Sequence, residues 1–345
     1  MRAHERGRNR RSRTQHREDG AGADRNADAS PYRAPRWLAG GHAQTIWPYR
    51  LQRPAVALRR ERIETPDGDF WDFDWLDAET ANAPMVVLFH GLEGSSDSHY
   101  ARALLAALAR RGWRGVVPHF RGCSGEPNRL PRAYHSGDHQ EIGAMLAAVR
   151  RAVPYPVPLH AVGVSLGGSA LLNWLGRAGS AASQTVTSAA AVSAPLDLTA
   201  AGVAIGRGLN RIYTVHFLST LKPKSLAMAA RFPGLLDPSR IRRVRTMWEF
   251  DDAVTAPLHG FAGTSDYWTR ASSKRWLREI AVPTLVINAR NDPFIPARSL
   301  PSAGDVARSV TLEQPAHGGH AGFANGRFPG GVDWLPARLL HYFAG

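Results

Sequence analysis

The sequence predicts an α/β fold in which a mostly parallel, doubly wound sheet carries helices on both faces. Apolar runs of strand length alternate with Ala- and Leu-rich stretches of helix length along most of the 345 residues. Such alternation is the pattern of βαβ units. Several strand runs are apolar throughout, as strands buried on both faces of a parallel sheet require. With 43% apolar residues, the chain can also form a sizeable core.

The first predicted elements are a hairpin, a buried strand and a helix. In RRERIETPDGDFWDFDWL, over residues 59–76, Pro-Asp-Gly separates two strand-like runs, which predicts a hairpin at the antiparallel edge of the sheet. PMVVLFHG at 84–91 is typical of a buried strand. HYARALLAALARRGW at 99–113 has helical spacing, and Gly112 supplies the stop signal.

The alternation then continues and completes a sheet of eight strands. The further predicted strands are 115–120, 159–165, 185–195, 283–292 and 308–319. The further predicted helices are 140–153, 166–179, KRWLREI at 274–280 and a terminal helix at 332–343.

Two segments depart from this alternation. Residues 196–270 lack a buried-strand pattern and are too long for a simple loop, so we predict a cap or lid inserted between two strands. Residues 1–36 carry ten Arg, five acidic residues and almost no large aliphatic side chains. This composition predicts a disordered tail, with the α/β domain spanning 37–345. The tail also lacks the apolar run of a secretory signal and the acid-poor character of a transit peptide.

Charge and cysteine content exclude several classes of protein. Residues 1–36 contribute about five of the net charge of +14, and the remaining basic residues are scattered. Only three of the 43 basic residues are Lys, and no nucleic-acid-binding motif accompanies them. We therefore expect no nucleic-acid partner. No apolar run reaches about 18 residues, so we expect no integral membrane segment. The single cysteine, Cys123, excludes an intrachain disulfide and favours a reducing, cytoplasmic location.

Metal binding is also not predicted. His135 and His139 have ligand-like spacing, but Ser136 and Gly137 interrupt any helix between them, and no further ligand cluster is in register. A turn is the favoured interpretation of this segment.

The strongest chemical signal is Gly163-Val164-Ser165-Leu166-Gly167, a Gly-x-Ser-x-Gly motif between a predicted strand and a predicted helix. In this context the motif forms a sharp turn that exposes a nucleophilic serine above the sheet. The pattern predicts the α/β-hydrolase fold, with Ser165 as the nucleophile.

A serine nucleophile needs a general base, which in this fold follows the nucleophile and the acid along the chain. His317 and His320 both lie in the loop PAHGGHAGF after the last predicted strand, where the base belongs. We prefer His320, because the glycines around it suit a loop that approaches another backbone closely, but spacing alone does not separate the two. His216, His259 and His341 lie in the insertion or the last helix.

Two aspartates are candidates for the residue that orients the base. Asp292 directly follows the strand at 283–290, one strand before the histidine loop, and Asp197 follows the preceding strand. We prefer Asp292 on its position. Alternatively, either aspartate has a purely structural role and caps a turn or a helix.

An oxyanion hole requires backbone N–H groups that point at the tetrahedral intermediate. Leu166, directly after the nucleophile, is the first candidate donor. The second is Leu92, in the loop His90-Gly91-Leu92-Glu93-Gly94 that follows a predicted strand. His90 is then a loop-orienting or buried histidine and not a base.

Several longer segments resemble the YheT-like esterases, the fourth family of the AB hydrolases. The matching segments cover most of the chain after residue 36: GGHAQTIWP, FHGLEGSSDSHYARALLAALARRGW, FRGCSGEPNRLPRAYHSGD, GVSLGGSALLNWLG, EFDDAVTAPLHGF, PTLVINARNDPFIP and GGHAGF. The resemblance implies a charge-relay system at Ser165, Asp292 and His320. It also implies cofactor-free hydrolysis of carboxylic esters. The Arg-rich tail lies outside the family pattern.

The resulting hypothesis is a carboxylesterase that acts on a small-molecule acyl ester. A thioesterase or acyltransferase would use the same three residues with a different leaving group or acceptor. A non-catalytic binding protein on the same fold is the alternative from another class.

Overall fold

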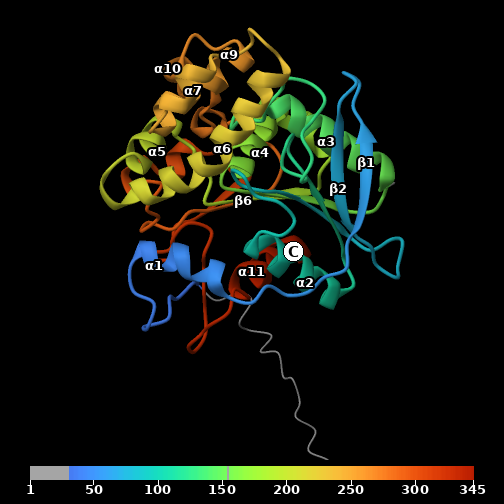
Figure 1. The fold of residues 1–345 in the computed structure, drawn as a ribbon. Helices are drawn as coiled ribbons and strands as arrows, with labels where there is room; N and C mark the ends of the chain where they lie inside the picture. Colours follow the sequence, from blue (N-terminus) through green and yellow to red (C-terminus); the bar gives the residue numbers. More distant parts are fainter. Residues whose placement is uncertain (1–30, 154) are drawn as a thin grey trace, which may run out of the picture.

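The computed structural model describes residues 31–153 and 155–345, arranged around one eight-stranded sheet (Figure 1). The sheet order is β1-β2-β4-β3-β5-β6-β7-β8. The strands are β1 (Arg59–Glu64), β2 (Phe70–Leu76), β3 (Met85–Phe89), β4 (Arg114–Pro118), β5 (Leu159–Val164), β6 (Ser188–Val192), β7 (Thr284–Ile287) and β8 (Val310–Glu313).

The strand directions explain the sequence pattern. β3 to β8 pair in parallel, and β1 and β2 form the antiparallel edge, with β2 antiparallel to β4. The central strands β3 and β5 are buried at every position, which is why they read as continuous apolar runs. The predicted α/β-hydrolase sheet is confirmed.

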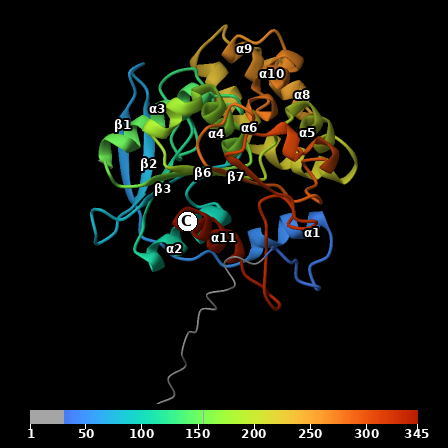
Figure 2. The same ribbon diagram turned by 180° about the vertical axis from the view of Figure 1, so that it is seen from behind.

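Helices cover both faces of this sheet. α2 (His99–Arg111) packs against α11 (Trp334–Ala344) on one face, and α3 (His139–Ala152) packs against α4 (Leu166–Ala178) on the other, as Figures 1 and 2 show. Two separate apolar cores result. Phe89, Ile142 and Leu171 lie in the first, and Leu88, Leu105 and Leu339 in the second.

A helical insertion occupies the chain between β6 and β7. It contains α5 (Leu198–Ile205), α6 (Arg211–Arg231), α7 (Pro238–Arg243), α8 (Met247–Phe250), a π-helix η5 (Asp251–Thr255), α9 (Ala256–His259) and α10 (Thr264–Ala271). Part of it has a core of its own, with Leu218, Ile241 and Phe250 buried together. Figures 1 and 2 show these helices on the same side of the sheet as α4.

The predicted helix at KRWLREI is mostly wrong. Only Lys274–Trp276 forms a short 3-10 turn. The amide of Lys274 donates to Leu196 O, while Leu277 and Ile280 are buried in the core next to β7. Tertiary contacts therefore determine the path of this segment.

The predicted tail boundary also needs correction. Residues 1–30 lie outside the described residues, but Tyr32 is buried, and its hydroxyl donates to Ala324 O at 2.7 Å. Its ring contacts Phe323 edge-on. The folded part of the chain therefore includes residues before Trp37, because one large aromatic side chain anchors them.

Among the described helices, none combines the length and the apolar character needed to cross a bilayer.

Candidate active site

Ser165 lies at a sharp turn between β5 and α4. Its backbone has φ 54° and ψ −121°, a conformation that residues other than glycine rarely adopt. The turn is also crowded, since a Cβ on Gly163 would lie 2.5 Å from Gly167 O, and one on Gly167 would lie 2.5 Å from Phe89 O. Both glycines of the motif are therefore required by close backbone contacts.

A hydrogen-bonded chain runs from Ser165 through His320 to Asp292. Ser165 Oγ lies 2.8 Å from Nε2 of His320, and Nδ1 of His320 lies 2.8 Å from Oδ2 of Asp292. The other carboxylate oxygen of Asp292 accepts from the amide of Phe294 at 2.7 Å. The Asp292 and His320 side chains are buried, and the ring of Phe294 packs against the imidazole at 4.1 Å between centroids. Such an arrangement fixes the orientation of the imidazole.

The alternative candidates lie elsewhere. His317 is exposed, and its Nδ1 lies 3.4 Å from Nδ2 of Asn291. Asp197 caps the first turn of α5, where its carboxylate accepts from the amide of Ala200 at 2.9 Å. The structure brings neither side chain into the hydrogen-bonded chain of Ser165.

A short helix near the start of the chain holds the His320 loop. This helix, α1 (Gly41–Ile46), was not expected from the sequence. Thr45 Oγ1 accepts from the amide of His320 at 2.9 Å, and Gln44 Oε1 accepts from the amide of Gly318 at 2.8 Å. Gln44 Oε1 also accepts from the side chain of Asn291 at 2.9 Å, so α1 contacts the loops of both His320 and Asp292.

Sequence reasoning missed Gln44 and Thr45. The segment GGHAQTIWP, which contains both residues, is one of those that resemble the family. The resemblance assigned no role to Gln44 or Thr45. The contacts join positions about 275 apart in the chain, and periodicity within one segment contains no information about such contacts.

The amides of Leu92 and Leu166 are the candidate oxyanion donors near Ser165. The N–H groups of Gly91, Glu93 and Gly94 all donate within the protein, to Tyr100 Oη, Tyr134 Oη and Gly91 O. Within residues 31–153 and 155–345, no acceptor is found for the N–H of Leu92 or of Leu166, and both residues line the cavity at Ser165. Free amides of this kind can stabilise a developing oxyanion.

The loop that contains Leu92 is tied to the helical insertion. Glu93 has φ 56°, and its carboxylate accepts from Tyr134 Oη at 2.9 Å. Its second oxygen lies 2.8 Å from Nζ of Lys224, which projects from α6. This ion pair connects the loop after β3 with the insertion.

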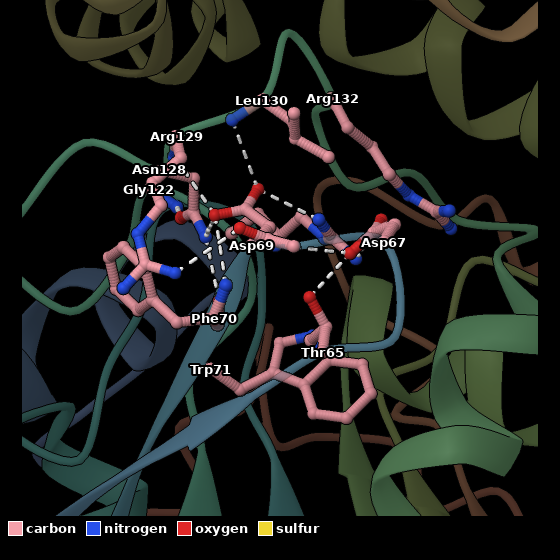
Figure 3. Close-up of polar contacts among 12 residues, drawn as sticks. Thr65, Asp67, Asp69, Phe70, Trp71, Gly122, Asn128, Arg129, Leu130 and Arg132 are labelled. Carbon is pink, nitrogen blue, oxygen red and sulfur yellow. Dashed lines mark hydrogen bonds and ion pairs between the residues drawn. The ribbon is translucent and has the colours of Figure 1, made fainter.

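Asp69 holds the loop 121–138, which lines the cavity across from the insertion, through several hydrogen bonds (Figure 3). Its carboxylate has no solvent exposure and accepts from Nδ2 of Asn128, from the amide of Arg129 and from Nη1 of Arg121, each at 2.8 to 2.9 Å. These hydrogen bonds hold the pKa of Asp69 below its ordinary value although burial acts in the opposite direction. Arg121 also pairs with buried Glu141 at 2.8 Å, so the loop rests on a buried network of charges.

Ser165 and His320 open onto a cavity of about 580 Å³. Residues of the loop 121–138 form one wall. The insertion forms the other, largely with apolar side chains: Leu198, Ala201, Ile205, Phe217, Leu221, Met228, Phe250, Val254 and Leu258. Large, mostly apolar cavities with a few polar groups are typical of small-molecule sites.

One acidic group lies in this apolar wall. Asp251, in the π-helix, accepts from Trp268 Nε1 and from Thr255 Oγ1, each at 2.7 Å. Burial raises the pKa of its carboxyl to about 6, against the lowering effect of these two hydrogen bonds.

Comparisons with known proteins agree with this architecture. The family model described as alpha/beta hydrolase fold matches residues 84–326. The protein "Putative esterase YheT" of Escherichia coli (strain K12) is 40% identical over 310 residues, covering 88% of this chain and 90% of that protein. "Phospholipase ABHD3" of Mus musculus is 31% identical over 303 residues, covering 85% of this chain and 73% of that protein.

A solved structure extends the comparison to three dimensions. The esterase EaEST from Exiguobacterium antarcticum matches with a TM-score of 0.53 and 16% identity, covering 83% of this chain and 100% of that one. At this identity the likeness shows the fold alone. The sequence matches confirm the predicted family. The chain belongs to the α/β-hydrolase superfamily and, within it, to the YheT-like family of esterase- and phospholipase-type hydrolases.

Proposed function

We propose that this protein is a serine hydrolase that cleaves carboxylic esters, with Ser165 as nucleophile, His320 as base and Asp292 as its orienting acid. The observation that carries the proposal is the hydrogen-bonded chain from Ser165 Oγ through His320 to Asp292, with 2.8 Å at each link. The strained turn at Ser165 supports it, because such backbone conformations are concentrated at functional sites.

The reaction proceeds in two halves. His320 Nε2 takes the proton as Ser165 Oγ attacks the ester carbonyl, and the amides of Leu92 and Leu166 donate to the oxyanion. The imidazolium then protonates the leaving alcohol, which departs and leaves an acyl-enzyme. Water, activated by the same imidazole, hydrolyses the acyl-enzyme and restores Ser165.

The insertion between β6 and β7 serves in this proposal as a lid that selects the substrate. Its mostly apolar lining and the volume of about 580 Å³ support an ester with a large apolar acyl part. For the location of the protein, the single cysteine supports the reducing cytoplasm, since Cys123 has no partner for a disulfide within the chain.

The test compares the chain with its Ser165→Ala variant on p-nitrophenyl esters of graded chain length and on a fluorophosphonate probe. We expect turnover to fall by about 10⁴-fold or more and labelling to disappear, because both the acyl-enzyme and the phosphonylated adduct form on the Ser165 hydroxyl. His317→Ala is the matched control, since His317 is exposed and lies three residues from the base. Undiminished hydrolysis by Ser165→Ala would overturn the proposal.

A further inference from the structure

We propose that the outer surface at the start of α6 docks onto an anionic phospholipid bilayer. Three aliphatic side chains are strongly exposed there: Leu209 at 73%, Ile212 at 52% and Val215 at 67%. Their spacing of three residues places them along one side of the chain as η4 (Gly208–Asn210) continues into α6. We call these three residues the apolar patch.

The charge around the apolar patch is basic. Arg207 and Arg211 flank Leu209 and are both exposed. Arg207 and Arg211 are the only charged residues of the segment 198–216, which contains no Asp or Glu. Exposed aliphatic side chains beside basic ones are the pattern of surfaces that insert at the headgroup level of anionic membranes, because the apolar groups enter the interface while the cations meet lipid phosphates.

The opposite side of the same segment faces the cavity. Phe217, Leu221 and Met228 of α6 line it, together with Leu198 and Ile205 of α5. In Figures 1 and 2, α5 lies toward the edge of the molecule that also carries α1, and α6 lies between α5 and the middle of the molecule. Docking would therefore bring a bilayer against the helices that form the apolar wall of the cavity. The docking itself does not depend on hydrolysis.

A second copy of the chain fits the apolar patch less well. Stable protein interfaces involve roughly 20–30 residues on each side, whereas the apolar patch contains three. A symmetric contact would also set the basic segment 198–216 against its own copy without any acidic partner within that segment. An anionic lipid surface satisfies both the apolar and the cationic groups.

The experiment is vesicle co-sedimentation of the full chain with phosphatidylcholine vesicles, with and without phosphatidylglycerol, at fixed salt. We expect binding to the anionic vesicles. The triple variant Leu209→Ser, Ile212→Ser and Val215→Ser should bind at least about tenfold more weakly, since three aliphatic groups no longer enter the interface. The pair Arg207→Gln and Arg211→Gln should weaken binding less, and only with anionic vesicles.

Two controls isolate the apolar patch. Tyr155→Ser removes a side chain of 61% exposure that precedes β5, at the opposite end of that strand from Ser165, and should leave binding unchanged. Hydrolysis of a short, water-soluble ester by the triple variant should match that of the parent chain, which shows that the variant is folded. All variants keep the eight Arg of residues 1–30, so these residues contribute equally to the vesicle binding of the parent and of each variant.

Three results would overturn the proposal. The parent chain could fail to bind anionic vesicles, or the triple variant could bind as tightly as the parent. Sedimentation velocity could also show a dimer of the parent that the triple variant lacks, which would assign the apolar patch to a second copy.

Discussion

The two walls of the cavity are built from different interactions. The wall formed by the loop 121–138, with Ser165 and His320 beside it, rests on directional hydrogen bonds and buried charges, such as those of Asp69 with Arg121 and of His320 with Asp292. The insertion wall depends mainly on apolar packing, as between Leu218, Ile241 and Phe250. Directional bonds fix groups in one geometry, whereas apolar packing tolerates changes of shape. We therefore expect changes in the first wall to alter turnover or folding, and changes in the second to alter substrate choice.

The largest effect is expected for Asp292→Asn. The variant keeps the shape of the side chain but presents an N–H group where His320 Nδ1 needs an acceptor, so kcat should fall by about 10⁴-fold. Steady-state kinetics on a p-nitrophenyl ester measures it. Asp197→Asn is the control, because Asp197 only caps α5, and its kcat should remain within a few-fold of the parent. A larger loss in Asp197→Asn would reverse the assignment of the acid.

A stability effect should follow from Asp69→Ala. The change leaves Arg121 and several amides without a buried acceptor, so the free energy of unfolding should fall by about 3 kcal/mol. Urea denaturation gives this value. Asp67→Ala removes a carboxylate that also pairs with Arg121 but is 38% exposed, and it should cost less than about 1 kcal/mol. Equal losses would show that burial does not set the difference.

The acidic group in the apolar wall should appear in the pH dependence of stability. Because the pKa of Asp251 rises from 3.8 to about 6 on folding, the folded state holds this proton more tightly than the unfolded state. Protonated Asp251 therefore adds to the free energy of unfolding below about pH 4. This stabilisation, roughly 3 kcal/mol, is lost as the pH rises through about 6. Asp251→Asn lacks this loss, so its stability relative to the parent should rise between pH 4 and 7 in urea denaturation. A difference that stays constant with pH would contradict the shift.

The smallest effect is expected for Leu221→Trp in the insertion wall. The larger side chain takes up space in the cavity, so kcat/KM for long-chain esters should fall by about tenfold while that for acetate esters changes little. A panel of p-nitrophenyl esters of graded length measures the ratio. An equal fall for every chain length would mean that Leu221 affects the reacting groups and not the acyl site.

The sequence predicted the parts of the fold that local patterns encode. The turn at Ser165 is specified within about 20 residues, by the apolar run before it, the glycines around it and the helix after it. The structure has this turn. The family resemblance rested on longer segments and is confirmed by relatives of the whole chain. The roles of Leu92 and Leu166 stay predictions.

The parts that the sequence did not predict depend on contacts between distant segments. Thr45 reaches the amide of His320 across the whole domain, and Tyr32 anchors residues expected to lie in the tail. His317 and His320 lie three residues apart in a glycine-rich loop, where no periodicity indicates which side chain turns inward. The packing of that loop against α1 and the hydrogen bonds of His320 to Asp292 and Ser165 separate them.

The backbone of Ser165 has an evolutionary consequence. A residue with φ 54° and ψ −121° costs about 1–3 kcal/mol unless it is glycine, so drift toward stability alone would replace the serine. Proteins keep such unfavourable residues where selection acts on activity and not on stability. In the proposed mechanism, selection for a reactive hydroxyl accounts for a serine, and not a glycine, at this turn.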